Sequence, residues 1–193
     1  MSIAYKYHMS EQDYLSSELT SPVKREFIAG EVFAMVGASS AHNLITGNMY
    51  AALHQHLRGK PCRPYTNDMK VRIAGDYYYP DVLVDCSELA DDDYATHTPI
   101  LIIEVLSQST KIYDKTFKRE RYQQIPTLQE YVMIEQETAV VEVLRRMDSW
   151  QPHYYGLGER FRLESIGLEM SVEEVYERIN NEDMRAWRAQ SAG

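Results

Sequence analysis

The chain has no apolar run as long as the roughly 18 residues of a membrane-spanning helix, and its N-terminus has no signal-peptide core. Cysteine is scarce as well, since only Cys62 and Cys86 occur, each in or beside a strand-like segment. Two cysteines in such segments indicate reduced, packed thiols rather than a disulfide framework. We therefore expect a cytoplasmic protein with no membrane partner.

Positive charge is also in short supply. The chain has 20 lysines and arginines against 29 aspartates and glutamates, which gives a formal net charge of −9 at pH 7. A nucleic-acid-binding protein usually carries a basic footprint, so any affinity for DNA should be weak and should fall with salt. Repeats, low-complexity tracts and linkers rich in proline and glycine do not occur in the 193 residues. This length suits one domain with a sizeable core, and we expect a single domain over residues 1–193.

Among the residues that are present, a carboxylate inside an apolar run is the main feature. Residues 100–107 read Ile-Leu-Ile-Ile-Glu-Val-Leu-Ser, a stretch rich in β-branched residues. Such a run predicts a central strand that is covered on both faces. Removing the carboxylate of Glu104 from water is unfavourable unless the group is paired, hydrogen-bonded or bound to a metal. We therefore expect a cation next to Glu104.

Asp81 lies in a similar setting. Residues 77–86 are aromatic and β-branched and predict another strand, in which Pro80 marks an edge or a bulge. Period-two alternation gives Asp81 and Glu104 each a defined face of its own strand. If the two strands pair with both acids on the same side, the two carboxylates can converge on one metal ion.

The remaining patterns predict the order of elements. Residues 26–36 predict a β-hairpin that turns at Ala29-Gly30. The further predictions are a helix over 42–57 with Ser40 as its cap, a strand over 62–73 with a bend near Asn67-Asp68, strands over 77–86, 100–106 and 130–135, a helix over about 111–124, and a closing hairpin over 139–155.

The order αβββαβ is typical of an α/β fold with a mixed central β-sheet flanked by helices, here with an N-terminal β-hairpin. The core should cover about residues 25–157. A capping box at Ser171 predicts a C-terminal helix over about residues 171–190.

The helix predicted after the Glu104 strand is the most basic part of the chain, with five basic and two acidic residues in the eleven that start at Lys111. The spacing of Lys111, Lys115, Lys118 and Tyr122 places them along one helix face. A helix that follows a strand by a short connection packs back over the sheet, so Lys118 can reach Glu104. The alternative for such lysines is a solvent-exposed face with i,i+4 ion pairs.

Several motifs together carry a resemblance to a known family. They are Pro80-Asp81, Glu104-Val105-Leu106-Ser107-Gln108-Ser109-Thr110, Asp114, Lys118, Tyr122, Glu26-Phe27-Ile28-Ala29-Gly30-Glu31, Met35, His42 and Glu130-Tyr131. This set resembles the Uma-type family of proposed restriction endonucleases, within the PD-(D/E)XK nuclease superfamily. The resemblance extends over nearly the whole chain, from about Met9 to Tyr176.

The resemblance implies a restriction endonuclease-like core with a divalent metal, usually Mg²⁺, for which Mn²⁺ can substitute. Asp81, Glu104 and the backbone carbonyl of Val105 would hold the metal, because hard cations prefer oxygen ligands. The superfamily pattern places a lysine two residues after the second acid, where this chain has Leu106. Lys118 on the following helix is the matching candidate.

The implied reaction is hydrolysis of DNA phosphodiester bonds. Lys118 would orient the attacking water or stabilise charge on the phosphate. Glu31 would add a metal ligand or position a water, and His42 would contact phosphate or transfer a proton. We expect a homodimer by analogy with nucleases that cut both strands.

Structural interpretations of the same residues stay open. Asp81 can be an edge or turn residue, and Glu104 can form a structural ion pair with a helix lysine. Glu31 can lie on the hairpin surface, and His42 can be a hydrogen-bonding residue at a helix N-terminus. The tyrosines at 77–79 either stack on bases or pack across strands.

Two other functions also stay open. One is a non-catalytic protein that keeps the nuclease fold and acts as a binding or regulatory module. The other is a different carboxylate-pair hydrolase, such as a glycosidase. The basic helix favours a phosphate substrate over a neutral one.

Overall fold

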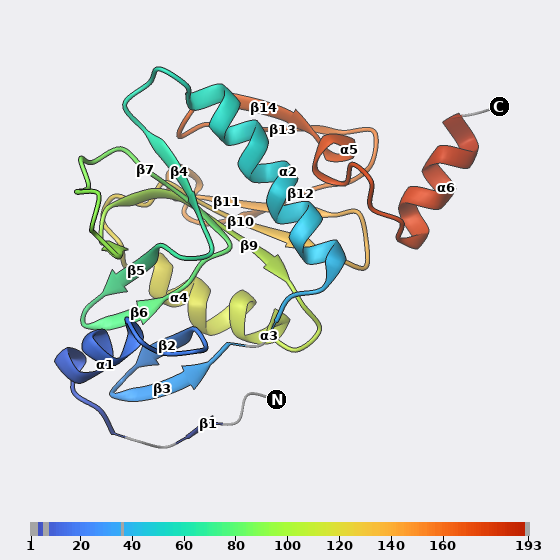
Figure 1. Ribbon diagram of the computed structural model, residues 1–193. Helices are drawn as coiled ribbons and strands as arrows, with labels where there is room; N and C mark the ends of the chain where they lie inside the picture. The colour runs from blue at the N-terminus through green and yellow to red at the C-terminus, as the bar shows by residue number, and fades with distance from the viewer. Residues whose placement is uncertain (1–3, 6–7, 36, 192–193) are drawn as a thin grey trace.

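A six-stranded mixed sheet carries the segment around Glu104. In the computed structural model, which describes residues 4–5, 8–35 and 37–191, its strands follow the order β12-β11-β10-β9-β7-β4 (Figure 1). β9 runs parallel to β10, and the other neighbouring pairs of this sheet are antiparallel. The strands are β4 (Arg63–Thr66), β7 (Val82–Asp85), β9 (Pro99–Leu106), β10 (Glu130–Glu135), β11 (Val141–Arg145) and β12 (Pro152–Tyr155). The predicted mixed central sheet is confirmed.

β9 is covered on both of its faces, as its apolar sequence predicts. Leu101, Ile103 and Val105 belong to the hydrophobic cluster that includes α2 (Ser40–Leu57), whereas Ile102 and Leu106 belong to a second cluster on the opposite face. Because side chains alternate along a strand, Glu104 lies on the face of this second cluster.

A second six-stranded sheet, which the sequence patterns do not predict, lies beside the first. Its order is β1-β3-β2-β6-β5-β8, with β1 (Ala4–Tyr5), β2 (Arg25–Ile28), β3 (Glu31–Ala34), β5 (Lys70–Ile73), β6 (Asp76–Tyr78) and β8 (Ala95–Thr96). Asn67, in the left-handed region with φ 46°, lies between β4 and β5. Tyr79-Pro80-Asp81 lies between β6 and β7. Each of the segments 62–73 and 77–86 is therefore two strands rather than one, because it passes from one sheet to the other, at the predicted bend near Asn67 and at Pro80.

The predicted N-terminal hairpin is confirmed as β2 and β3. Ala29 and Gly30 both have positive φ, 51° and 82°, and a turn with two such residues matches the twist of a two-residue hairpin. Val36, at the end of the predicted hairpin segment, lies outside the described residues.

Helices cover the two faces of the central sheet. The helical segments of the described residues are α1 (Glu11–Glu18), α2, α3 (Lys111–Tyr113), the π-helical turn η1 (Asp114–Lys118), α4 (Arg119–Tyr122), the 3₁₀ turn η2 (Arg146–Asp148), α5 (Val172–Val175) and α6 (Glu182–Ser191). α3, η1 and α4 form the helix predicted after the Glu104 strand. The cap of α2 is Ser39 rather than the predicted Ser40, because the Ser39 hydroxyl accepts the N–H of His42 at 3.1 Å.

The C-terminal region differs from the single helix predicted over residues 171–190. The capping box at Ser171 is present, but α5 ends after four residues, and Arg178, with φ 62°, lies between α5 and α6. Figure 1 shows α6 projecting from the body of the molecule. An antiparallel pair, β13 (Arg160–Leu163) and β14 (Leu168–Ser171), precedes α5 and was not predicted.

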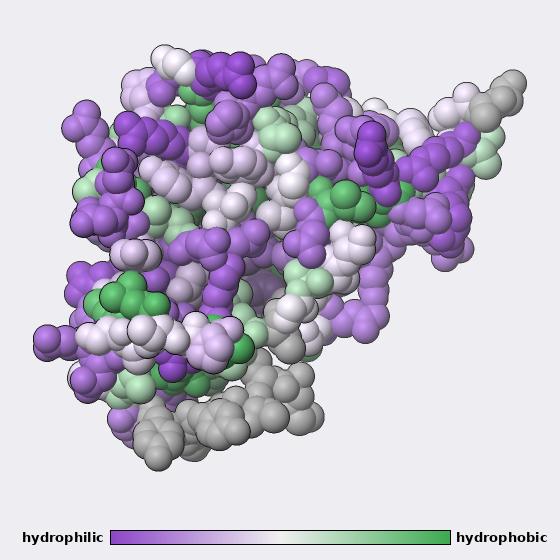
Figure 2. Space-filling view, viewed as in Figure 1, coloured by the Kyte–Doolittle hydropathy of each residue, from purple (hydrophilic) through white to green (hydrophobic). Residues whose placement is uncertain are grey.

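Hydrophilic side chains cover most of the face shown in Figure 2. Among the helices that the structure describes, none combines the length and the hydropathy needed to span a bilayer.

Cys62 and Cys86 form a disulfide bond, so the prediction of two reduced thiols is wrong. Arg63 of β4 pairs with Asp85 of β7, and each cysteine is the chain neighbour of one member of this pair. The pairing of the two strands therefore brings the sulfurs together. The disulfide removes the cysteine argument for a cytoplasmic location, which stays a prediction.

We expect the double substitution Cys62→Ser/Cys86→Ser to lower the free energy of unfolding by about 3 kcal/mol, because the open chain gains loop entropy in the unfolded state. Urea unfolding under non-reducing conditions measures this difference. A reductant should destabilise the native protein by a similar amount and leave the variant unchanged. Two titratable thiols in the native, oxidised protein would contradict the disulfide.

Candidate active site

Strand pairing places Asp81 and Glu104 side by side. Val82 pairs with Ile103 in the antiparallel ladder of β7 and β9, so the residue before Val82 lies level with the residue after Ile103. Asp81 itself lies just outside β7, which means that strand alternation does not set its direction. Its Oδ2 atom instead accepts the backbone N–H of Val105 at 2.7 Å. The two acids thus meet at one end of the β7–β9 pair.

Lys118 makes direct contact with Glu104, as predicted. Its Nζ atom lies 3.1 Å from Oε1 of Glu104 and 3.0 Å from Oε1 of Glu26. Asp114 is close as well, with Oδ1 at 3.6 Å from the same ammonium. The side chain of Lys118 is only 7% exposed, so this is a buried ion cluster rather than a surface pair.

The helix that supplies Lys118 contacts Glu104 through a second residue as well. Tyr122, one turn further on, donates its hydroxyl to Oε1 of Glu104 at 2.8 Å, which fixes the same carboxylate oxygen from a second direction. Asp114 and Lys118 are the first and last residues of the π-helical turn η1, a rare feature that is common at functional sites. In Figure 1 the C-terminal end of β9 lies between α2 and this helix.

The hairpin carboxylate in contact with Lys118 is Glu26 rather than Glu31. Glu26 is buried on β2, and it also accepts the backbone N–H of Tyr79 at 3.2 Å. Glu31 lies on β3 opposite Ile28 and is partly exposed. The signal for Glu26 was present in the sequence, because it too is a carboxylate at the edge of an apolar strand.

His42 approaches the site from α2. Its Nε2 atom lies 3.2 Å from Oδ2 of Asp81. Burial disfavours the charged imidazolium, but the hydrogen bond to Asp81 and the carbonyl of Val105 outweigh it, and the pKa of His42 is raised. The structure therefore brings His42, Asp81, Val105, Glu104 and Lys118 into one constellation.

The cluster has more carboxylates than cations. Four acids converge on it, Glu26, Asp81, Glu104 and Asp114, against the charges of Lys118 and His42. Burial and the neighbouring acids raise the pKa of Glu104 well above its ordinary value despite the attraction of Lys118, and burial likewise raises the pKa of Asp114. Burial alone would lower the pKa of Lys118, yet Glu104 and Glu26 raise it, so this lysine stays protonated.

The other basic residues of the helix do not form a free basic surface. Lys111 pairs with Glu135 at 2.8 Å, and Lys115 pairs with both Glu135 and Glu142. Arg121 pairs with Asp76 at 3.2 Å. The local excess of positive charge seen in the sequence is largely neutralised within the fold.

The donor chemistry of the cluster fits a divalent cation. Among the described residues, Oδ1 of Asp114 is buried without a hydrogen-bond partner, and the hydrogen bonds of the Glu104 and Asp81 carboxylates use only Oε1 and Oδ2, respectively. In the part of the chain that the structure describes, no three His, Cys, Asp or Glu side chains form a complete ligand set. Mg²⁺ does not need one, because it binds through one or two carboxylates and keeps several waters. Asp81, Glu104 and the Val105 carbonyl, which lies on the same strand edge as the Val105 N–H, are the residues suited to hold it.

The architecture, with Asp81, Glu104 and Lys118 brought together beside β9, is typical of the restriction endonuclease-like α/β fold. A solved structure titled "Crystal structure of a putative nuclease belonging to DUF820", from Anabaena variabilis, shares the fold with a TM-score of 0.69 over 89% of this chain and 99% of that one, at 14% sequence identity.

Sequence comparison identifies the family. The profile of the Uma2 family, described as "Putative restriction endonuclease", matches residues 11–173, and the chain belongs to this family. Two Synechocystis proteins are similar over most of their length. The protein slr1290 is 31% identical over 87% of this chain and 91% of its own, and sll1609 is 35% identical over 83% and 88%.

We expect Lys118→Met to lower the free energy of unfolding of the metal-free protein by roughly 3–5 kcal/mol, because it leaves Glu104 and Glu26 buried without their cation. Urea unfolding measures the loss. Lys24→Met is the matched control, since Lys24 is 44% exposed and pairs with the exposed Asp68, and it should cost less than about 1 kcal/mol. Equal effects of the two substitutions would contradict the buried cluster.

Without divalent cations, the contribution of Glu104 to stability should fall as the pH rises above 4.5, the ordinary pKa of glutamate, and that of Asp114 should fall in the same direction. The raised pKa values of Glu104 and Asp114 mean that their protonated forms stabilise the folded state fully below the unfolded-state values. This contribution is lost as the pH rises through the raised values. Thermal unfolding over a pH series measures the slope.

Glu104→Gln is the control for the pH series, because glutamine has no proton to lose, and it should give a shallower slope. His42, whose pKa is raised above 6.5, acts in the same direction in both proteins and cancels in the comparison. Identical slopes would show that Glu104 titrates normally.

Proposed function

We propose that this protein is a divalent-metal-dependent endonuclease that hydrolyses phosphodiester bonds of DNA at Asp81, Glu104 and Lys118. The observation that carries the proposal is the contact of Lys118 with Glu104 at 3.1 Å. It supplies, from the following helix, the lysine that Leu106 does not provide on the strand. The family and the fold support a nuclease, and the excess of carboxylates supports a cation at this site.

A divalent cation, Mg²⁺ or Mn²⁺, would be held by Asp81, Glu104 and the Val105 carbonyl, and when bound it would polarise the scissile phosphate and lower the pKa of a bound water. Lys118 and Tyr122 both donate to Oε1 of Glu104, so they would orient the carboxylate, with Oε2 available as a ligand for the cation. Val105 does the same for Asp81 through its N–H to Oδ2.

The remaining groups have roles set by charge and position. The ammonium of Lys118 offers a fixed positive charge for the phosphate as its negative charge increases. His42, with its raised pKa, holds a proton at the Asp81 side of the site and is placed for phosphate contact or proton transfer. Glu31 stays a prediction as an additional ligand or a water-positioning residue.

The charge distribution predicts how strongly the protein binds DNA. Since the chain has a net charge of −9 and the basic helix is largely paired, DNA binding should be weak and salt-sensitive. A homodimer, with one site for each strand of a duplex, is the assembly we propose by analogy.

Asp81→Asn and Glu104→Gln should each reduce Mg²⁺- or Mn²⁺-dependent cleavage of plasmid DNA by at least about 100-fold, because each removes a charged metal ligand. Agarose-gel nicking assays measure the rate, and circular dichroism verifies the fold. Glu177→Gln is the matched control, because its side chain is 69% exposed on the surface, and it should cleave at the native rate.

A second readout does not depend on turnover. Mn²⁺ should raise the melting temperature of the native protein and of Glu177→Gln but not that of Asp81→Asn. Full cleavage by both acid variants would reject the assigned roles. A native protein with neither cleavage nor thermal stabilisation by metal would instead be the non-catalytic binding or regulatory module.

A further inference from the structure

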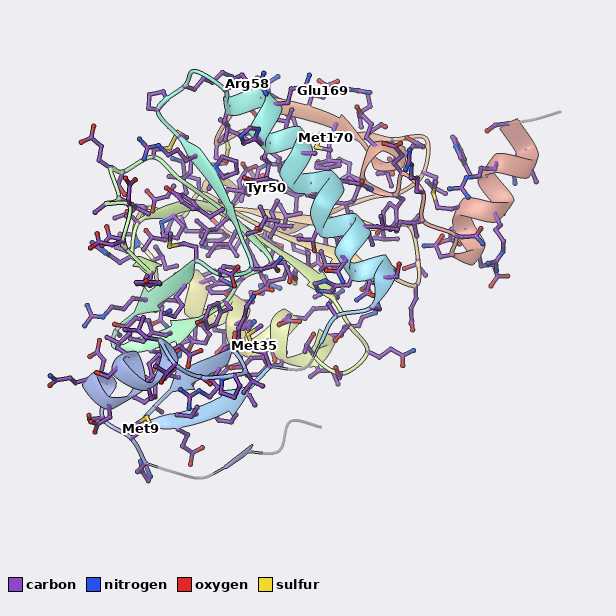
Figure 3. All side chains as sticks on the ribbon, in the orientation of Figure 1. Met9, Met35, Tyr50, Arg58, Glu169 and Met170 are labelled. Carbon is purple, nitrogen blue, oxygen red and sulfur yellow. A yellow bond between two sulfur atoms is a disulfide. The ribbon has the colours of Figure 1, made fainter. Side chains whose placement is uncertain are left out.

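An aromatic pocket opens next to the candidate active site. It has a volume of about 330 Å³, at the small end of ligand-binding pockets. It is lined by Tyr50, Pro64, Tyr65, Thr66, Asp68, Met69, Asp93 and Tyr94. These residues come from α2, from β4 and the turn after it, and from the loop before β8. Figure 3 labels Tyr50 in the middle of α2, alongside β4.

The pocket is joined to the site by backbone contacts. Thr66, in the pocket wall, pairs with Val82 at the start of β7. The next residue, Asn67, donates its N–H to the carbonyl of Asp81 at 3.1 Å. On α2, Tyr50 follows His42 by eight residues, a distance of about 12 Å along the helix axis. That distance equals roughly three to four nucleotides of a stacked strand at 3.4 Å each.

Stacking surface is the main property of the pocket. Tyr94 is 58% exposed, and Tyr50 and Tyr65 are half-buried. Aromatic rings of this kind bind flat π-systems, and nucleobases are the flat π-systems that a nuclease meets.

The charges around the rings disfavour two other classes of ligand. Asp68 and Asp93 would repel a phosphate, but they can accept hydrogen bonds from the amino groups of bases. A cationic ligand is disfavoured because Lys70 already places its ammonium 5.6 Å from the ring centre of Tyr94, and Lys24 lies 2.6 Å from Asp68. A neutral, aromatic, hydrogen-bonding ligand remains.

We propose that this pocket binds an unpaired nucleobase of the same strand whose phosphate lies at Asp81 and Glu104. The proposal rests on the proposed nuclease function, and it gives that function a substrate class: a strand with at least one base out of the duplex, in a single-stranded, gapped or distorted region. A base within a duplex cannot stack on the tyrosines of the pocket, because neighbouring base pairs cover both of its ring faces.

Binding of single-stranded oligonucleotides, with Ca²⁺ in place of Mg²⁺, tests the proposal by fluorescence anisotropy. Tyr94→Ala should weaken binding roughly 5- to 100-fold, because it removes one stacking surface. Tyr94→Phe keeps the ring and should bind as the native protein does. Tyr154→Ala is the matched control, since Tyr154 is 60% exposed on β12, and it should have no effect.

Photocrosslinking identifies the contact directly. An oligonucleotide with a single 5-iodouracil should crosslink to peptides that contain Tyr50, Tyr65 or Tyr94, and an abasic competitor should displace it poorly. The same experiment with DNA and RNA versions of the oligonucleotide shows whether the pocket binds a base of DNA or of RNA.

The outcomes separate this proposal from the nuclease function. Equal affinity of Tyr94→Ala and native protein, with crosslinks outside the pocket, would overturn the base pocket and leave the Asp81 and Glu104 cleavage result standing. Crosslinks in the pocket together with a native protein that does not cleave would support the base pocket and reject the hydrolytic site. A native protein that binds no single strand of either kind would overturn the proposal.

Discussion

The ammonium of Lys118 joins three parts of the chain that are distant in sequence. It contacts Glu104 of the central sheet at 3.1 Å and Glu26 of the second sheet at 3.0 Å, from a helix that belongs to neither. Buried charges are stable only with partners, so this contact fixes the helix against both sheets. The acids around it outnumber the cations, and burial together with the neighbouring acids raises the pKa values of Glu104 and Asp114. The candidate metal site follows from that imbalance.

The site lies where the chain crosses between the two sheets. Pro80 cannot donate a ladder hydrogen bond, and the strand breaks there, which releases Asp81 from strand geometry. Its carboxylate can then accept the N–H of Val105, while its own carbonyl accepts the N–H of Asn67 at the other crossing. Both crossings thus meet at Asp81. The aromatic pocket lies beside the crossing at Asn67, because its chain neighbours Thr66 and Asp68 are part of the pocket wall.

The sequence patterns correctly predicted the features that depend on residues close together in the chain. The central strand of Glu104, the hairpin at Ala29-Gly30 and the helix of Lys118 follow from apolar runs, turn residues and helical spacing, and all three are present. The features that were missed depend on register or on long-range contacts. The Cys62–Cys86 disulfide needs the pairing of β4 with β7, the second sheet needs the breaks at Asn67 and Pro80, and the role of Glu26 needs the hairpin to dock on the helix. The contact between Lys118 and Glu104 could be predicted because the strand and the helix that carry them are adjacent in sequence.

A crystal of the protein soaked in Mn²⁺ and measured at the manganese absorption edge tests the central claim most directly. We predict an anomalous peak about 2.1 Å from a carboxylate oxygen of Asp81 and of Glu104, with Lys118 still bonded to Glu104 on the other side. A map without a peak in reach of both acids, at Mn²⁺ concentrations that occupy other sites in the crystal, would contradict the claim.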